Sequence, residues 1–212
     1  MSDRSLRRLG AASGIFYVVL TILGSDVLGG TKTGVGILVE LLGFAFFPFF
    51  LGSLWVCLRS AEGDGGWLSA TAFAGGLVAL AVKLASAAPI LAVRASEGID
   101  PGIAKALIAM NDASFGITFL PLAVMLSATA IVAVRTGALP RWLGWGAAVV
   151  ALGLLGTLSA VVVAPSPPEW AFLPMLLLLL WTVATSIAMI QRAGRPYPVE
   201  TAHLAGEPAR VR

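Results

Sequence analysis

The segment GGLVALAVKLASAAPILAV, residues 75–93, is apolar or small throughout apart from Lys83 near its middle. A helix needs about 20 predominantly apolar residues to cross a bilayer, so this segment is long enough to span one. An ionisable group inside such a span is costly, and it indicates either a paired residue or a functional site. The segment therefore predicts a membrane helix in which Lys83 has a partner.

The composition extends this prediction to the whole chain. Of its 212 residues 58% are hydrophobic and 12% charged, with a mean hydropathy of +0.93. Soluble domains carry about 25% charged residues, so the chain has the composition of a membrane protein. Its net charge is +3, but no predicted helix has a basic face, and nucleic acid is therefore excluded as a partner. The one cysteine, Cys57, and the one histidine, His203, leave no basis for a metal site or a cofactor.

Six apolar segments are predicted to span the membrane, and turn residues or charges separate them. They are residues 9–28, 35–57, 67–92, 113–134, 142–163 and 171–191. The longest connection, 94–112, contains Asp100 and Pro101, which suit a helix cap and first position. We expect a short interfacial helix there that leads into the fourth span. The predicted organisation is an all-α membrane bundle over residues 1–195, followed by a polar, flexible cytoplasmic tail over 196–212.

Basic residues predict the orientation of the bundle. Of the 14 lysines and arginines, ten fall on one side of the predicted spans and three on the other, with Lys83 inside a span. Cytoplasmic loops of membrane proteins are enriched in Lys and Arg. Both termini are therefore predicted to be cytoplasmic, in a multi-pass protein of the plasma (inner) membrane.

With this orientation, the charges in or beside the spans fall in the outer half of the bilayer. At 1.5 Å per residue, Glu40 lies about 8 Å from the outer end of its span and Lys83 about 13 Å from the outer end of the next. The short connection between these spans makes them neighbours. The sequence predicts an outer-half polar pocket, with Lys83 at its floor, to which these residues contribute: Lys83, Glu40, Asp26, Asn111, Asp112 and Tyr17.

Each of these residues also has a purely structural interpretation. Glu40 and Lys83 can neutralise each other without binding anything, Asp112 can cap the fourth span, and Asp26 can be a solvated rim residue. Tyr17 can bond to neighbouring backbone. The aromatic run FAFFPFF, residues 44–50, can pack against helices or lipid, or can line a cavity for an apolar ligand. The small residues Gly10 and Gly14 favour close helix packing, within one chain or in a homodimer.

Three stretches resemble a family of bacterial multi-helix membrane proteins grouped as a domain of unknown function. They are LRRLGAASGIFYVVLTILG at 6–24, MNDASFGITFLPLAVML at 110–126 and LPRWLGWGAAVVALGLLG at 139–156. The resemblance implies a six-helix integral membrane protein and assigns no catalytic residues.

Nucleotide-binding, hydrolase and metalloprotease motifs are absent from the sequence. The leading hypothesis is a protein that binds or translocates a small amphipathic molecule, with Glu40 as proton or cation acceptor and Lys83 as its counter-charge. The first alternative is a membrane-embedded acid–base enzyme acting on a lipid or isoprenoid-like substrate, with Glu40 or Asp112 as the acid. The second is an accessory membrane subunit without chemistry. The expected partners are the lipid bilayer, a small apolar or amphipathic ligand and, alternatively, a second copy of the chain.

Overall fold

The computed structural model describes residues 3–27, 34–63, 65–163 and 169–193, and within these ranges the secondary structure is helical. The elements in chain order are α1 (Asp3–Ile22), the π-helix η1 (Leu23–Val27), α2 (Gly34–Glu62), α3 (Trp67–Ala95), α4 (Pro101–Ile117), α5 (Phe119–Thr136), α6 (Arg141–Val163), the 3-10 helix η3 (Glu169–Phe172) and α7 (Leu173–Ala193). The predicted tail, 196–212, lies outside the described residues.

Six helical segments are long and apolar enough to cross a membrane. They are Ser5–Ser25, Gly34–Glu62, Trp67–Ala95, Pro101–Thr136, Arg141–Val163 and Trp170–Ala193. Each overlaps one of the six predicted spans, so the predicted all-α membrane bundle is confirmed. The second, third, fourth and sixth helical segments are longer than the apolar runs because they continue into flanking residues.

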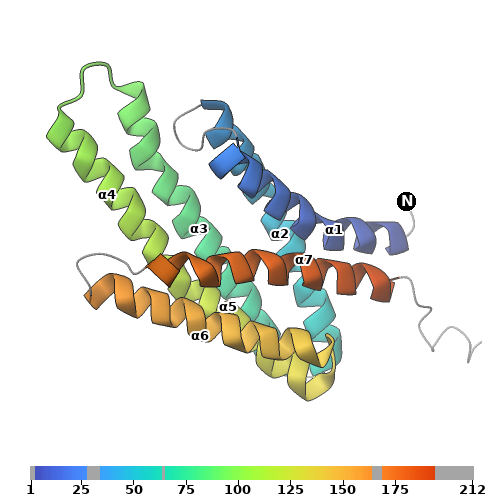
Figure 1. Ribbon diagram of the computed structural model, residues 1–212. Coiled ribbons are helices and arrows are strands. Elements are labelled where there is room, and N and C mark those ends of the chain that lie inside the picture. The colour runs from blue at the N-terminus through green and yellow to red at the C-terminus, as the bar shows by residue number, and fades with distance from the viewer. Residues whose placement is uncertain (1–2, 28–33, 64, 164–168, 194–212) are drawn as a thin grey trace, which may run out of the picture.

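The spans alternate in direction, as Figure 1 shows, and each packs against its successor in the chain. A further contact, α1 against α7, closes the bundle, and α3 packs against both α4 and α5 of the fourth span. The start of α1, the end of α7 and the α2–α3 and α5–α6 connections gather on one side (Figure 1). We call this side the arginine-rich end, because it carries these described arginines: Arg7, Arg8, Arg59, Arg135, Arg141 and Arg192. The opposite side is the α3–α4 end.

Hydrogen bonds tie together the connections at the arginine-rich end. The Glu62 carboxylate accepts bonds from the backbone N–H of Leu68 at 3.0 Å and of Ser69 at 2.8 Å, and so satisfies donors in the first turn of α3. The guanidinium of Arg192, on α7, donates to the carbonyls of Gly137 and Ala138 in the α5–α6 connection. The last helix is thereby joined to a turn more than fifty residues earlier.

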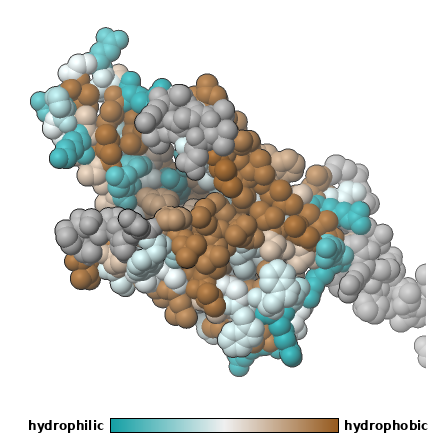
Figure 2. All heavy atoms as spheres, viewed as in Figure 1, coloured by the Kyte–Doolittle hydropathy of each residue, from teal (hydrophilic) through white to brown (hydrophobic). Residues whose placement is uncertain are grey.

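The outer surface of the bundle is largely apolar. Figure 2 shows hydrophobic residues covering the visible faces of α1 and α7, with hydrophilic residues at the α3–α4 end and at the arginine-rich end. Large side chains on these and other helices are exposed, among them Leu180 at 66% and Leu152 at 70%. Apolar surface on this scale is unfavourable in water, and between two polar ends it fits a hydrocarbon layer.

Glycines allow the helix backbones of the bundle to approach closely. A Cβ built on Gly10 would collide with the Ser53 side chain of α2, and one on Gly14 with Ser186 of α7 and Phe50 of α2. These two glycines therefore serve packing within the chain, one of the two roles predicted for them.

The segment before the fourth span agrees only in part with its prediction. Asp100 does cap α4, accepting a bond from the Gly102 N–H at 2.7 Å, and Pro101 takes its first position. However, α4 packs against α3 and continues through Thr118, which has helical dihedral angles, into α5. The expected helix is therefore present, and it forms one continuous helical segment with the fourth span, Pro101–Thr136. Asp112 is accordingly inside a helix and does not cap the fourth span.

A buried hydrogen bond links the last two spans and gives a first testable prediction. Trp181, which is 5% exposed, donates from Nε1 to the Leu143 carbonyl at 2.9 Å. Trp181→Phe leaves that carbonyl without this donor, and we expect a loss of about 1–2 kcal/mol in the free energy of unfolding. Trp142→Phe, on the exposed side of α6, is the control and should change it by less than about 0.5 kcal/mol. Equal effects in the two variants would contradict a role for the hydrogen bond.

Candidate functional site

Glu40 of α2 and Lys83 of α3 form an ion pair inside the bundle. Lys83 Nζ lies 3.3 Å from Glu40 Oε1, and the two side chains are 23% and 16% exposed, respectively. Both positions lie in the half of the bundle toward the α3–α4 end, since Glu40 is in the second turn of α2 and Lys83 follows the midpoint of α3. Each group neutralises the charge of the other where little water is available to solvate it.

Aromatic rings flank the same ammonium group. Lys83 Nζ lies 5.0 Å from the centroid of the Phe115 ring and 5.5 Å from that of Phe44. Both distances are within the roughly 6 Å over which a cation is attracted to the face of a ring. Phe44 and Phe115 come from α2 and α4, so the lysine is held between two helices as well as by the carboxylate.

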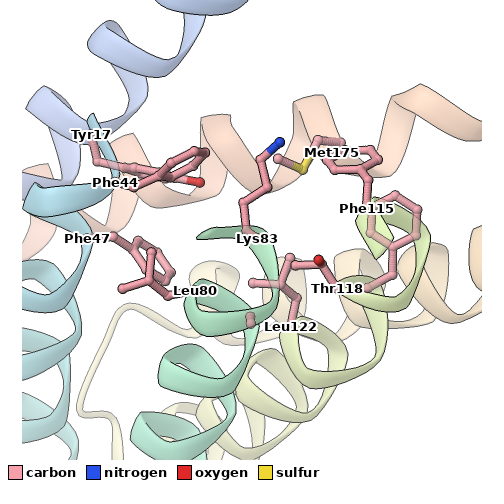
Figure 3. Close-up of a pocket in the computed structure, with 11 residues that line it drawn as sticks. Tyr17, Phe44, Phe47, Leu80, Lys83, Phe115, Thr118, Leu122 and Met175 are labelled. Atoms are coloured by element: carbon pink, nitrogen blue, oxygen red, sulfur yellow. The ribbon is translucent and has the colours of Figure 1, made fainter. Parts of the chain in front are cut away.

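Lys83 also lines a pocket formed by α1, α2, α3, α4, α5 and α7, together with Thr118 between α4 and α5. The enclosed cavity volume is about 30 Å³, and about 380 Å³ is reached only when the open space at its mouth is counted. Figure 3 shows Lys83 rising between Tyr17 and Phe44 on one side and Phe115 on the other, with its amine directed toward Met175. The complete lining is Tyr17, Phe44, Phe47, Ala79, Leu80, Lys83, Phe115, Thr118, Phe119, Leu122 and Met175.

The lining is apolar except at three places. One is the Lys83 ammonium, and another is the Thr118 hydroxyl, which donates to the Ser114 carbonyl at 3.1 Å. The third is Tyr17, which is 5% exposed and whose ring contacts Phe44 and Phe47 of α2. The structural interpretation of Tyr17, a hydrogen bond to neighbouring backbone, stays a prediction. A tyrosine hydroxyl can both donate and accept hydrogen bonds, so Tyr17 adds a polar group to the wall of the pocket.

The position of Glu40 depends on the end of α1. There the helix widens into η1, where Gly24 packs directly against α2. A Cβ on Gly24 would lie 2.5 Å from the backbone nitrogen of Glu40 and 2.7 Å from the Gly36 carbonyl oxygen. Such distances are far below van der Waals contact, so only glycine permits this approach. Single-turn π-helices are frequent at functional sites, and this one sets the backbone that carries the carboxylate.

The remaining predicted pocket residues are not brought to Lys83. Asn111 is half-buried on α4 and donates from Nδ2 to Asp112 Oδ1 at 3.1 Å, while Asp112 is exposed. Neither residue lines the pocket. Asp26 lies in η1, and its side chain is outside the described part of the chain. Of the predicted set, the structure thus joins Lys83 with Glu40 and places Tyr17 in the same pocket as Lys83.

Sequence reasoning did not identify the pocket residues contributed by α4 and α5. Phe115, Thr118, Phe119 and Leu122 recur at intervals of three and four, which places them on one helix face. That periodicity can be read from the sequence and predicts a shared helix face. It does not predict which helices that face packs against. Within the aromatic run, Phe44 and Phe47 line the pocket, whereas Phe49 is 64% exposed.

The geometry limits the chemistry that the pocket can perform. An ammonium group has three hydrogen-bond donors, and at Lys83 one of them faces Glu40, which leaves others for a ligand. The described residues contain no cluster of three or more His, Cys, Asp or Glu side chains that could hold a metal ion. The site can thus bind an acceptor group beside an apolar chain.

Comparison of the chain with protein-family models, curated proteins and solved structures finds no match.

Proposed function

We propose that the protein binds a small amphipathic molecule in the Lys83 pocket, with the polar head at Lys83 and the apolar part against the rings and aliphatic side chains. The observation that carries this proposal is the combination of a partly exposed ammonium and a tyrosine side chain in an otherwise apolar pocket. Small-molecule sites typically have this character, with mostly apolar walls and a few polar groups that fix orientation.

The position of the pocket supports uptake from one side of the membrane. The positive-inside rule assigns the arginine-rich end to the cytoplasm, so the α3–α4 end faces outward and the Lys83 pocket lies in the outer half of the bundle. On this assignment the protein is a multi-pass component of the plasma membrane. Below the pocket, Leu51, Met125 and Leu126 are at most 1% exposed. Translocation to the inner side would therefore require these residues to move, and binding is the step that the packing favours.

The enzymatic alternative receives less support from the geometry. It assigns the general acid to Glu40 or Asp112. Asp112 is exposed on α4, and Glu40 is not among the residues that line the pocket. A general acid must come within hydrogen-bond reach of its substrate. We therefore place binding first.

A steric test uses Ala79, which is 1% exposed and lines the deep side of the pocket. Three probes share an octyl chain and differ in head group: octanesulfonate, octanol and octyltrimethylammonium. In lipid nanodiscs we expect wild-type protein to bind at least one of them saturably, and Ala79→Leu to weaken that binding by about tenfold or more. The added carbons occupy the space of the octyl chain, because well-packed sites tolerate extra methylenes poorly.

Ala81→Leu is the matched control, since Ala81 is exposed two residues further along the same helix. It should bind the probe as the wild type does, and thermal unfolding of both variants should show that each is folded. Binding by no probe, or equal binding by a folded Ala79→Leu variant, would overturn the proposed function.

A further inference from the structure

We infer that the ligand's head group is an anion, and that Glu40 takes up one proton when the anion binds to Lys83. This inference rests on the proposed function and adds to it the chemical class of the ligand and a coupling to protons. It is carried by the geometry of the ion pair relative to the pocket.

The charge of the head group follows from which member of the pair faces the pocket. Lys83 lines the pocket, whereas Glu40 reaches Lys83 from outside the lining. The Tyr17 hydroxyl adds a neutral donor on the same wall. An entering molecule therefore meets a positive charge and a donor. An anionic acceptor such as a sulfonate or carboxylate is attracted there, and a cationic head is repelled.

Proton uptake follows from the charge balance of the pocket. Without a ligand, Lys83 and Glu40 carry one positive and one negative charge at 3.3 Å, and together they are neutral. An anion that binds Lys83 brings a second negative charge, and a net charge inside an apolar bundle is costly. One proton on the Glu40 carboxylate restores neutrality. Lys83 remains an ammonium, now paired with the ligand, and Glu40 becomes a neutral carboxylic acid.

Other charged and titratable groups around Glu40 do not replace it in this role. From α1, Tyr17 interacts electrostatically with Glu40, but its phenol is already protonated at neutral pH. From α3, the Arg94 guanidinium lies near the Gly34 backbone at the start of α2, and guanidinium groups do not titrate in this range. Asp112 of α4 is exposed to solvent, and the side chain of Asp26 lies outside the described residues. Among the described residues, Glu40 is the carboxylate in contact with Lys83.

Octanesulfonate tests the inference, because a sulfonate stays ionised throughout the range measured and cannot carry the proton itself. In wild-type nanodiscs we expect octanesulfonate to bind at least tenfold more tightly than octanol or octyltrimethylammonium. Its affinity should fall as the pH rises between about 5.5 and 8, approaching tenfold per pH unit where one proton is bound per ligand. Direct measurement of proton uptake in weakly buffered solution should give close to one proton per bound anion.

Glu40→Gln isolates the source of the pH dependence. With a neutral amide in place of the carboxylate, octanesulfonate should still bind and its affinity should no longer vary with pH. Asp112→Asn, which changes a carboxylate outside the pocket, should keep the wild-type slope. If Glu40→Gln folds poorly, the proton uptake of the wild-type protein still tests the coupling. A wild-type affinity independent of pH, no proton uptake, or an unchanged slope in a folded Glu40→Gln variant would overturn the coupling.

The two proposals fail separately. Preferential binding of octanol or octyltrimethylammonium, blocked by Ala79→Leu, would overturn the anionic head group and leave the proposed function standing. Absence of saturable binding for every octyl probe would overturn both.

Discussion

Replacing Glu40 by Gln is expected to lower the free energy of unfolding by about 2–3 kcal/mol. The change leaves the Lys83 ammonium without its carboxylate, and removing one partner of a buried pair typically costs about 3–5 kcal/mol. We expect a loss smaller than this typical range, because Lys83 is 23% exposed and keeps its two ring contacts. Reversible unfolding in detergent micelles, followed by tryptophan fluorescence, measures the difference.

A double variant separates the ion pair from other effects of the substitution. Glu40→Gln with Lys83→Met removes both charges, and it should recover most of the stability that either single variant loses. Octanesulfonate should also stabilise the Glu40→Gln variant more than the wild type, because the anion supplies the missing negative charge. Additive losses in the double variant would contradict an energetic coupling between the two residues.

Gly24→Ala is expected to have the second large effect, a loss of about 2–3 kcal/mol in the free energy of unfolding. The new Cβ would meet backbone atoms of α2, including the Glu40 nitrogen at 2.5 Å, and backbone cannot swing aside as a flexible side chain does. The end of α1 must then move away from α2, and overpacking of this kind usually costs about 1–3 kcal/mol. Because the contact is at Glu40, probe binding should weaken as well.

Gly156→Ala provides the control for this substitution. Gly156 is also in a helix, but a Cβ there would meet nothing within 4 Å. The exchange should leave stability unchanged or raise it by up to about 1 kcal/mol, the helix preference of alanine over glycine. A Gly24→Ala variant as stable as Gly156→Ala would show that the close approach of α1 to α2 is not required.

The sequence predicts the spans well because membrane insertion depends on length and hydropathy, both of which are local properties. It fails at α4, where Asn111 and Asp112 suggested the opening of a span. The helix already begins at the Asp100 cap, and these polar residues lie within its length. A polar pair on a helix surface resembles a helix start when the packing partner, α3, is unknown.

The candidate site was only partly predictable. The sequence predicts similar depths in the bilayer for Glu40 and Lys83, because these depths follow from the helix rise and the orientation of the spans. The sequence does not predict how each helix is rotated about its axis, since spans that are apolar on every face carry little amphipathic signal. The pocket face of Phe115, Phe119 and Leu122, and the contribution of Met175 from α7, depend on that rotation.

Photolabelling tests the central claim, an amphiphile-binding pocket at Lys83, most directly. The probe is octanesulfonate carrying a diazirine at the end of its chain, applied to the protein in nanodiscs and mapped by mass spectrometry. Labelling should concentrate on pocket residues such as Phe47, Leu80 and Leu122, fall when unlabelled octanesulfonate is added, and disappear in Lys83→Met. Labelling spread over lipid-facing residues such as Val78 and Leu180, unchanged by competitor and by Lys83→Met, would contradict the claim.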